Sequence, residues 1–343
     1  MQKKQLATLA IVLVVVLGGY LAYENFIKTS AEENWPERTI SNFVFSSAGG
    51  GTDQWNRIMC ALMEKSLGQR VTVANMPGGN GGTAAAHAWN SDHDGYTWLG
   101  CSETITTHPA TGSSKQMAKD WQFWVMAGSP GILCVSADSP YRTYGDLVKA
   151  EEDGAKKIKI GNSGMGKLWH LKAFIAANVG KINFEHVPYQ GSRPAIIACL
   201  SNEIDAVSAS VGEITDFIVS GKLRPLIMTE NEPFELDGFG KVPSAAEFFP
   251  DVKKYYPLNQ WLGFAMPIDV PQAVKDKTTK AFAAAIGTQD AANFAKEQKA
   301  TIYNLTGQAA NAMVMRQEQV MSWLLFDLGL AKIDPKTVGI QRP

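Results

Sequence analysis

Three glycine-rich stretches of this sequence have the residue types and the setting to bind an anion. They are SSAGGGTDQ at 46–54, NMPGGNGG at 75–82 and GNSGMGK at 161–167, and each follows an apolar run and precedes a helical pattern. Glycine lets the backbone come close to a ligand, and the first turn of a helix leaves amide donors unpaired at the positive end of its dipole. A carboxylate or a phosphate fits such a corner.

A single corner of this kind also has an ordinary explanation. Thr52 or Asp53 could cap the helix that follows, and the glycines would then serve a tight turn. Three such corners in one chain are difficult to attribute to turn chemistry alone, and ligands of open α/β sheets bind where strands end and helices begin. The repetition therefore favours a binding site.

The third corner has nearly the pattern of a nucleotide-binding phosphate loop. Gly161, Gly166 and Lys167 fit the spacing G-x-x-x-x-G-K between a strand and a helix. In a phosphate loop the next residue is a Ser or Thr whose hydroxyl holds Mg²⁺, but here it is Leu168. We therefore expect anion binding without nucleotide hydrolysis.

The rest of the chain alternates between strand and helix patterns that would position these corners. Apolar runs predict strands near 43–45, 70–74, 157–160, 184–188, 206–210, 223–228 and 261–266. Helical spacing predicts helices near 55–67, 83–89, 144–152, 168–179, 194–200, 212–219, 271–286 and 308–328. The alternation beyond residue 144 predicts a parallel α/β sheet. The length of 343 residues accommodates two lobes with a cleft between them, the first from 36–128 plus 229–335 and the second from 129–228.

The N-terminal segment 1–30 has the order of an export signal. Lys3 and Lys4 precede an apolar run at 6–23, and this run is about long enough to cross a bilayer. The basic end on the inside places the rest of the chain outside. We expect a protein of the periplasm or of the extracytoplasmic face of the cell membrane, with a cleaved signal peptide and a retained anchor as alternatives.

Composition and residue spacing exclude several function classes. The formal net charge of -1 gives no reason to expect nucleic-acid binding. The four cysteines are widely spaced in apolar contexts, which predicts buried thiols, and the five histidines lack the spacing of a metal site. We expect a monomer that uses no metal and no cofactor.

Short motifs follow one another in order from residue 40 to the C-terminal part of the chain. They are G-G-G-T-D at 49–53, N-x-P-G-x-x-G-G at 75–82, D-G-Y-T at 94–97, G-x-S-G-x-G at 161–166, V-P-Y-x-G at 187–191, V-P-S at 242–244 and W-x-G at 261–263. The ordered set resembles the substrate-binding proteins of tripartite tricarboxylate transporters, also called Bug receptors. The resemblance implies an α/β, two-lobed fold of the periplasmic-binding-protein type that closes on a small carboxylate and delivers it to membrane permease subunits.

The resemblance also implies which residues touch the ligand. In that family the first two corners form a pincer around one carboxylate, and the second lobe adds a loop before a helix and a Tyr-x-Gly segment. The matching ligand-binding positions in this sequence are Ala48, Gly50, Gly51, Thr52, Asp53, Pro77, Gly78, Gly81, Gly82, Ser163, Gly164, Lys167, His170, Tyr189 and Gly191.

Three large side chains near the corners have two interpretations each. Lys167 stands where the family usually has a small polar residue, and it is either a cation for a second carboxylate or a solvated surface charge. Trp55 and Trp169 are either core residues or an aromatic wall of the site, and we favour the core.

An exported hydrolase of small esters is the competing function class. Its best candidates are Ser163 and His170, which lie seven residues apart across a helix start and have no evident third member of a catalytic triad. The sequence therefore favours a receptor, and we assign no catalytic residue.

Overall fold

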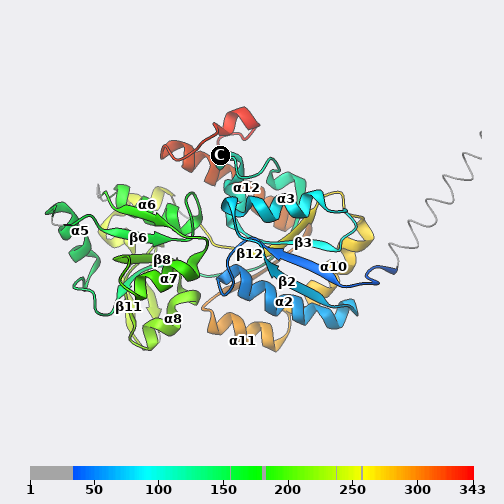
Figure 1. Cartoon of the computed structure of the whole chain (residues 1–343), viewed down its shortest axis with the longest axis horizontal. Coiled ribbons are helices and arrows are strands. Elements are labelled where there is room, and N and C mark those ends of the chain that lie inside the picture. Colours follow the sequence, from blue (N-terminus) through cyan, green and yellow to red (C-terminus); the bar gives the residue numbers. More distant parts are fainter. Residues whose placement is uncertain (1–33, 155, 180–182, 237, 256–257) are drawn as a thin grey trace, which may run out of the picture.

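The computed structural model describes residues 34–343 except 155, 180–182, 237 and 256–257 (Figure 1). The expected signal or anchor at 1–30 lies outside the described residues. Within the described part, no helix combines the length and the apolar character that crossing a membrane requires. This part of the chain folds into two α/β lobes, each built on its own sheet, as the sequence predicts.

The first lobe is built on a six-stranded sheet in the order β13-β4-β12-β3-β1-β2. β1 pairs parallel with β2 on one side and with β3 on the other, so the carboxyl ends of these three strands reach the same edge of the sheet. The strands are β1 (Ile40–Val44), β2 (Val71–Asn75), β3 (Thr97–Ser102), β4 (Trp121–Gly128), β12 (Leu262–Pro267) and β13 (Thr301–Leu305).

Helices cover both faces of this sheet. Met59 of α2 and Phe282 of α10 pack in one core, whereas Ala84 of α3 and Val314 of α12 pack in the other. Successive strand residues point to opposite faces, which is why one sheet supplies both cores. The helices of this lobe are α2 (Gly51–Leu67), α3 (Gly82–Asn90), α4 (His108–Thr111), α10 (Gln272–Ile286), α11 (Gln289–Glu297) and α12 (Gly307–Asp327).

The second lobe is built on a five-stranded sheet in the order β7-β6-β8-β5-β9. Leu133 of β5 faces a core that contains Leu168 of α6, and its neighbour Ile132 faces a core that contains Ile214 of α8. The strands are β5 (Gly131–Ser136), β6 (Lys159–Asn162), β7 (Glu185–Pro188), β8 (Ala206–Ser210) and β9 (Leu223–Met228). The helices are α5 (Tyr144–Glu152), α6 (Leu168–Val179), α7 (Ser192–Leu200) and α8 (Val211–Val219).

Both sheets are mixed, but the four strands for which the sequence predicts a parallel pattern, β6, β7, β8 and β9, all run in the same direction. β6 pairs parallel with β7 and β8, but β5 lies antiparallel between β8 and β9. In the first lobe, β12 lies antiparallel between β3 and β4. β5 and β12 are the first sheet strands after the chain passes from one lobe to the other, so their direction is set by the crossing and not by a preceding helix.

Helix α12 packs with both lobes. Its first half places Val314 in a core of the first lobe, and its second half places Met321 and Leu325 in the same core as Leu168 of the second lobe. The lobes are therefore joined by the crossing from β4 to β5, the return from β9 to β12, and this helix. Short elements complete the chain: η1 (Gly79–Gly81), η2 (Glu103–Thr107), η3 (Ala118–Asp120), β10 (Phe234–Leu236), β11 (Gly240–Val242), α9 (Ala245–Phe248), η4 (Pro250–Tyr255) and η5 (Pro335–Val338).

Several side chains that the sequence assigned to the core are buried. The thiols are free and buried, as their apolar contexts predict, at Cys60, Cys101, Cys134 and Cys199. Trp55 packs in the core between α2 and the first sheet, and Trp169 packs in a core of the second lobe.

Candidate functional site

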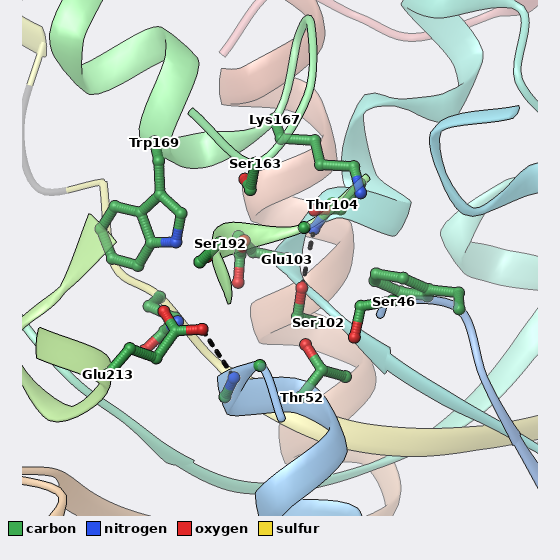
Figure 2. A pocket seen from close by; sticks show the side chains of 15 residues that line it. Ser46, Thr52, Ser102, Glu103, Thr104, Ser163, Lys167, Trp169, Ser192 and Glu213 are labelled. Atoms are coloured by element: carbon green, nitrogen blue, oxygen red, sulfur yellow. Dashed lines mark hydrogen bonds between the residues drawn. The ribbon is translucent and has the colours of Figure 1, made fainter. Parts of the chain in front are cut away.

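A cavity of about 30 Å³ lies between the two lobes (Figure 2). One water molecule needs roughly 10–15 Å³ of such space, so the cavity holds a few waters at most and the lobes are closed on it. The first lobe lines it with Phe45, Ser46, Gly50, Gly51, Thr52, Ser102, Glu103, Thr104 and Gln260. The second lobe lines it with Ser163, Lys167, Trp169, Gly191, Ser192 and Glu213.

The N-terminus of α2 opens onto this cavity without a cap from its own N-cap residue. That residue is Gly50, in an extended conformation with φ -78° and ψ 164°, and it has no side chain that could cap the helix. The alternative in which Thr52 or Asp53 caps this helix is therefore wrong. Because Gly50 has no side chain to cover the first turn, Gly50, Gly51 and Thr52 all border the cavity.

Asp53 stabilises the loop of the first corner but does not line the cavity. Its carboxylate accepts hydrogen bonds from the Gly49 amide at 2.8 Å and from the Asn75 side chain at 2.8 Å, and it pairs with Arg57 at 2.9 Å. Burial favours the neutral acid, but the hydrogen bonds from Arg57, Gly49 and Asn75 outweigh it and hold the pKa of Asp53 below its usual value. The acid thus fixes the loop of the first corner to the loop of the second.

The second corner supports a wall of the cavity and does not itself line it. The residues in question are Pro77, Gly78, Gly81 and Gly82, and Ala48 of the first corner is likewise absent from the lining. A Cβ on Gly81 would lie 3.1 Å from the Phe45 ring, which does line the cavity. The loop is held by a hydrogen bond of 2.9 Å between His108 Nε2 and the Asn80 carbonyl.

Lys167 is a buried residue of the cleft. Its side chain is 5% exposed, and its ammonium lies 5.6 Å from the centroid of the Phe45 ring of the opposite lobe. Burial lowers the pKa of Lys167 to about 8, against the opposing effect of the Glu103 carboxylate. The interpretation of Lys167 as a solvated surface charge is therefore wrong, and a cation faces the cavity (Figure 2).

Other predicted residues of the second lobe have separate roles. Ser163 and Gly191 line the cavity, but Gly164, His170 and Tyr189 do not. The Tyr189 hydroxyl donates to Glu203 at 2.8 Å. His170 Nδ1 accepts from the Gly166 amide at 3.0 Å, and burial with the neighbouring His186 lowers the pKa of His170 to about 3.

Sequence reasoning missed a buried acid on the floor of the cavity. Glu103 follows β3 at the start of η2, is 3% exposed, and its Oε2 has no hydrogen-bond partner among the described residues. Burial raises the pKa of Glu103 to about 7. Its position directly after an apolar strand, at the same sheet edge as the first two corners, was the signal that could have found it.

Two further lining residues that sequence reasoning missed share a second signal. Ser192 and Glu213 lie in the first turns of α7 and α8, where side chains point toward the carboxyl edge of the sheet. Ser210 and Glu213 also have the Ser-x-x-Glu spacing that marks a helix start. The other missed lining residues are Phe45, Ser46, Ser102, Thr104 and Gln260, and Trp169, for which the sequence left two interpretations, lines the cavity as well. Trp169 is thus both a core residue and a wall of the cavity.

Known proteins resemble this chain in sequence and in fold. The profile of the tripartite tricarboxylate transporter family receptor (TctC) matches residues 56–330. The chain belongs to this family. A TctC-type receptor of two lobes was predicted from the motif series, and that prediction is confirmed.

Individual proteins are similar to this chain in sequence or in fold. A UPF0065 protein encoded in the tcbD-tcbE intergenic region of Pseudomonas sp. (strain P51) is 27% identical over 270 residues, which cover 77% of this chain and 78% of the relative. The periplasmic binding protein BugD has the same fold, with a TM-score of 0.79, 23% identity, and coverage of 87% of this chain and 99% of BugD. The protein Rpa4515 of R. palustris, whose structure contains adipate, matches with a TM-score of 0.79, 22% identity and coverage of 87% and 99%.

Proposed function

We propose that this TctC-type receptor binds a small organic acid with two or more carboxylates outside the cytoplasm and delivers it to the permease subunits of a tripartite transporter. The cleft between the lobes is the ligand site. Binding of the acid stabilises the closed form, and the permease recognises that form. The receptor acts as a monomer at the extracytoplasmic face of the membrane or in the periplasm.

One observation carries the proposal. The uncapped N-terminus of α2 in the first lobe and the Lys167 ammonium in the second lobe border the same cavity. Amides at a helix N-terminus and a buried ammonium both favour carboxylates. An acid with a carboxylate at each end would contact both lobes, so its binding energy would favour the closed state.

The adipate in the structure of Rpa4515 supports this ligand class, because adipate has a carboxylate at each end and that protein shares the fold. The ligand-bound closed form must hold the lobes further apart than this structure does, since the cavity of about 30 Å³ is too small for such an acid. The length of ligand that this chain accepts depends on that separation.

The exported hydrolase is disfavoured by the contacts of its candidate base. His170 Nδ1 already accepts the Gly166 amide, and the low pKa of the His170 ring makes it a poor proton acceptor near neutral pH. Ser163 would then lack an activating base in this arrangement.

A thermal-shift screen followed by calorimetry tests the proposal. The full chain is titrated with mono-, di- and tricarboxylates of two to seven carbons, and the same samples are assayed for hydrolysis of simple esters. We expect a rise in melting temperature with at least one class of di- or tricarboxylate and no ester hydrolysis above that of a Ser163→Ala variant. An unchanged melting temperature with every carboxylate would contradict the proposal.

A further inference from the structure

The helix N-terminus in the cleft already holds a carboxylate from the protein itself. The Gly51 amide of α2 donates a hydrogen bond of 2.7 Å to Glu213 Oε1, which belongs to α8 of the second lobe (Figure 2). This contact joins residues 162 positions apart in the sequence and crosses the cleft. Glu213 therefore stands where the proposed function places a carboxylate of the ligand.

Glu213 is held in this position from its own lobe. Its second oxygen, Oε2, accepts a hydrogen bond of 2.7 Å from the Ser210 hydroxyl. Ser210 is the N-cap of α8, and its hydroxyl also accepts the Glu213 amide at 3.3 Å. One carboxylate oxygen is thus bound by each lobe, so the side chain is a bridge that exists only when the lobes are close.

The glycines of the first corner leave room for this bridge. A Cβ on Gly50 would lie 3.4 Å from Glu213 Oε1, and a Cβ on Gly51 would lie 3.6 Å from its carboxyl carbon. The carboxylate therefore packs directly on the backbone of the uncapped helix start. A ligand carboxylate would need the same space and the same amide.

We propose that Glu213 is an internal occupant of the carboxylate site at the N-terminus of α2. It holds the lobes together in the ligand-free protein, and a ligand carboxylate binds α2 by displacing it. The identity of the displacing group rests on the proposed function. The contact between Glu213 and α2 is independent of that function. Glu213 then determines specificity. An acid that displaces Glu213 from α2 breaks the bridge between the lobes, and only an acid that binds both α2 and the second lobe replaces that bridge.

Charge in the cavity favours displacement over joint occupancy. Three ionisable side chains line it, the acids Glu103 and Glu213 and the base Lys167. A dicarboxylate added beside both acids would bring four carboxyl groups to one ammonium in a closed cleft, where like charges repel strongly. Moving Glu213 away from α2 removes one of these charges and vacates the amide.

Displacement has a measurable consequence for affinity. The ligand binds only molecules in which Glu213 has left α2. The apparent affinity is therefore the intrinsic affinity multiplied by the fraction of such molecules. Removal of the Glu213 carboxylate should therefore strengthen carboxylate binding, although it removes a polar group from the cleft. A residue that contacts the ligand directly would show the opposite effect.

The test compares Glu213→Ala and Glu213→Gln with Asp216→Asn in the full chain. Asp216 lies one turn further along α8 and is exposed, so its substitution removes the same charge without touching the cleft. Small-angle scattering measures the radius of gyration without ligand, and calorimetry measures affinity for adipate and malate. We expect Glu213→Ala to be more expanded than the native chain and to bind a dicarboxylate about threefold to tenfold more tightly. Glu213→Gln should show a smaller change because its amide oxygen can still accept from Gly51, and Asp216→Asn should match the native chain.

Two results would overturn the inference. An unchanged radius of gyration in Glu213→Ala would show that the bridge does not hold the lobes. An expanded variant with weaker dicarboxylate binding would show that Glu213 helps to bind the ligand and does not compete with it. If the native chain bound no carboxylate at all, the proposed function would fail, and the scattering comparison would still decide whether Glu213 holds the lobes together.

Discussion

Gly191 of the second lobe lies so close to Ser47 of the first that a Cβ on Gly191 would be 2.3 Å from the Ser47 hydroxyl oxygen. Gly191 is the N-cap of α7 and has φ 131°, a backbone conformation that glycine adopts readily and other residues rarely do. A side chain at position 191 would therefore have to displace the Ser47 hydroxyl when the lobes close.

Substitution of Gly191 by alanine should block closure. The added Cβ would collide with Ser47 in the closed form only, because the two residues belong to different lobes. We expect Gly191→Ala to have a larger radius of gyration than the native chain in small-angle scattering, with and without ligand, and about tenfold weaker ligand binding.

The double variant Gly191→Ala with Ser47→Gly provides the control. Removal of the Ser47 side chain eliminates the nearest contact but leaves any backbone strain at residue 191 in place. Recovery of compaction in the double variant would therefore identify the contact between lobes as the cause. Equal defects in the single and double variants would attribute the effect to strain in the second lobe.

The Lys167 ammonium should contribute to the binding of acids with two or more carboxylates. A buried cation that pairs with a carboxylate in a closed cleft contributes about 1–3 kcal/mol, so Lys167→Met should weaken binding of di- and tricarboxylates by about tenfold or more. Monocarboxylates held by α2 should be less affected. Calorimetry with a dicarboxylate and its monocarboxylate analogue measures the difference.

The matched control is Lys222→Met, which removes an exposed lysine of the same lobe. This variant should bind every acid as the native chain does, since Lys222 does not line the cavity and an exposed charge, screened by salt, contributes close to nothing. Equal losses of mono- and dicarboxylate binding in Lys167→Met would argue against pairing with a second carboxylate.

Local sequence patterns predicted the elements of this fold well. The helix at 168–179 and the strands at 206–210 and 223–228 have the predicted bounds, because buried residues such as Leu168, Leu171 and Ile175 recur at regular spacing. The direction of β5 and β12 was not predictable in this way. It depends on how the chain crosses between the lobes, and the spacing of apolar residues within a segment carries no information about that crossing.

The site was predictable only where its chemistry lies in one continuous stretch. The first corner was found because Gly50, Gly51 and Thr52 are adjacent and start a helix. Glu103 and Glu213 were missed because their roles arise when separate strands and two lobes come together, as the bond across 162 residues from Gly51 to Glu213 shows.

Gly82 should be a packing residue, so its substitution should act on stability before it acts on binding. A Cβ on Gly82 would lie 1.9 Å from the Ser113 carbonyl oxygen, although Gly82 has an ordinary helical φ of -62°. Overpacking of this kind costs about 1–3 kcal/mol or more, and we expect Gly82→Ala to lower the midpoint of denaturant unfolding accordingly.

Gly68→Ala separates this steric effect from backbone strain. Gly68 ends α2 with φ 70°, and a Cβ there meets nothing within 4 Å. Its substitution should cost only about 1 kcal/mol, the usual cost of a left-handed conformation. If Gly82→Ala were as stable as the native chain yet failed to bind ligand, the second corner would contact the ligand directly, as the family resemblance implies.

Ligand affinity should fall as the pH rises from about 6.5 to 9. The pKa of Glu103 is about 7 and that of Lys167 about 8 in the ligand-free cleft, both because of burial. A carboxylate ligand favours the neutral form of Glu103 and the charged form of Lys167, so binding raises both pKa values. The complex then holds more protons than the free protein, and binding weakens as the pH increases through this range.

Calorimetry in two buffers of different ionisation enthalpy at pH 7.5 measures this proton uptake directly. Glu103→Gln should remove the part of the pH dependence near 7, and Lys167→Met the part near 8, so each variant assigns one step. Affinity that is constant over the range, or proton release on binding, would contradict the placement of the ligand beside these two side chains. Retention of the full pH dependence in Glu103→Gln would assign it to Lys167 alone, and the buried acid would then act only through the shape of the cavity.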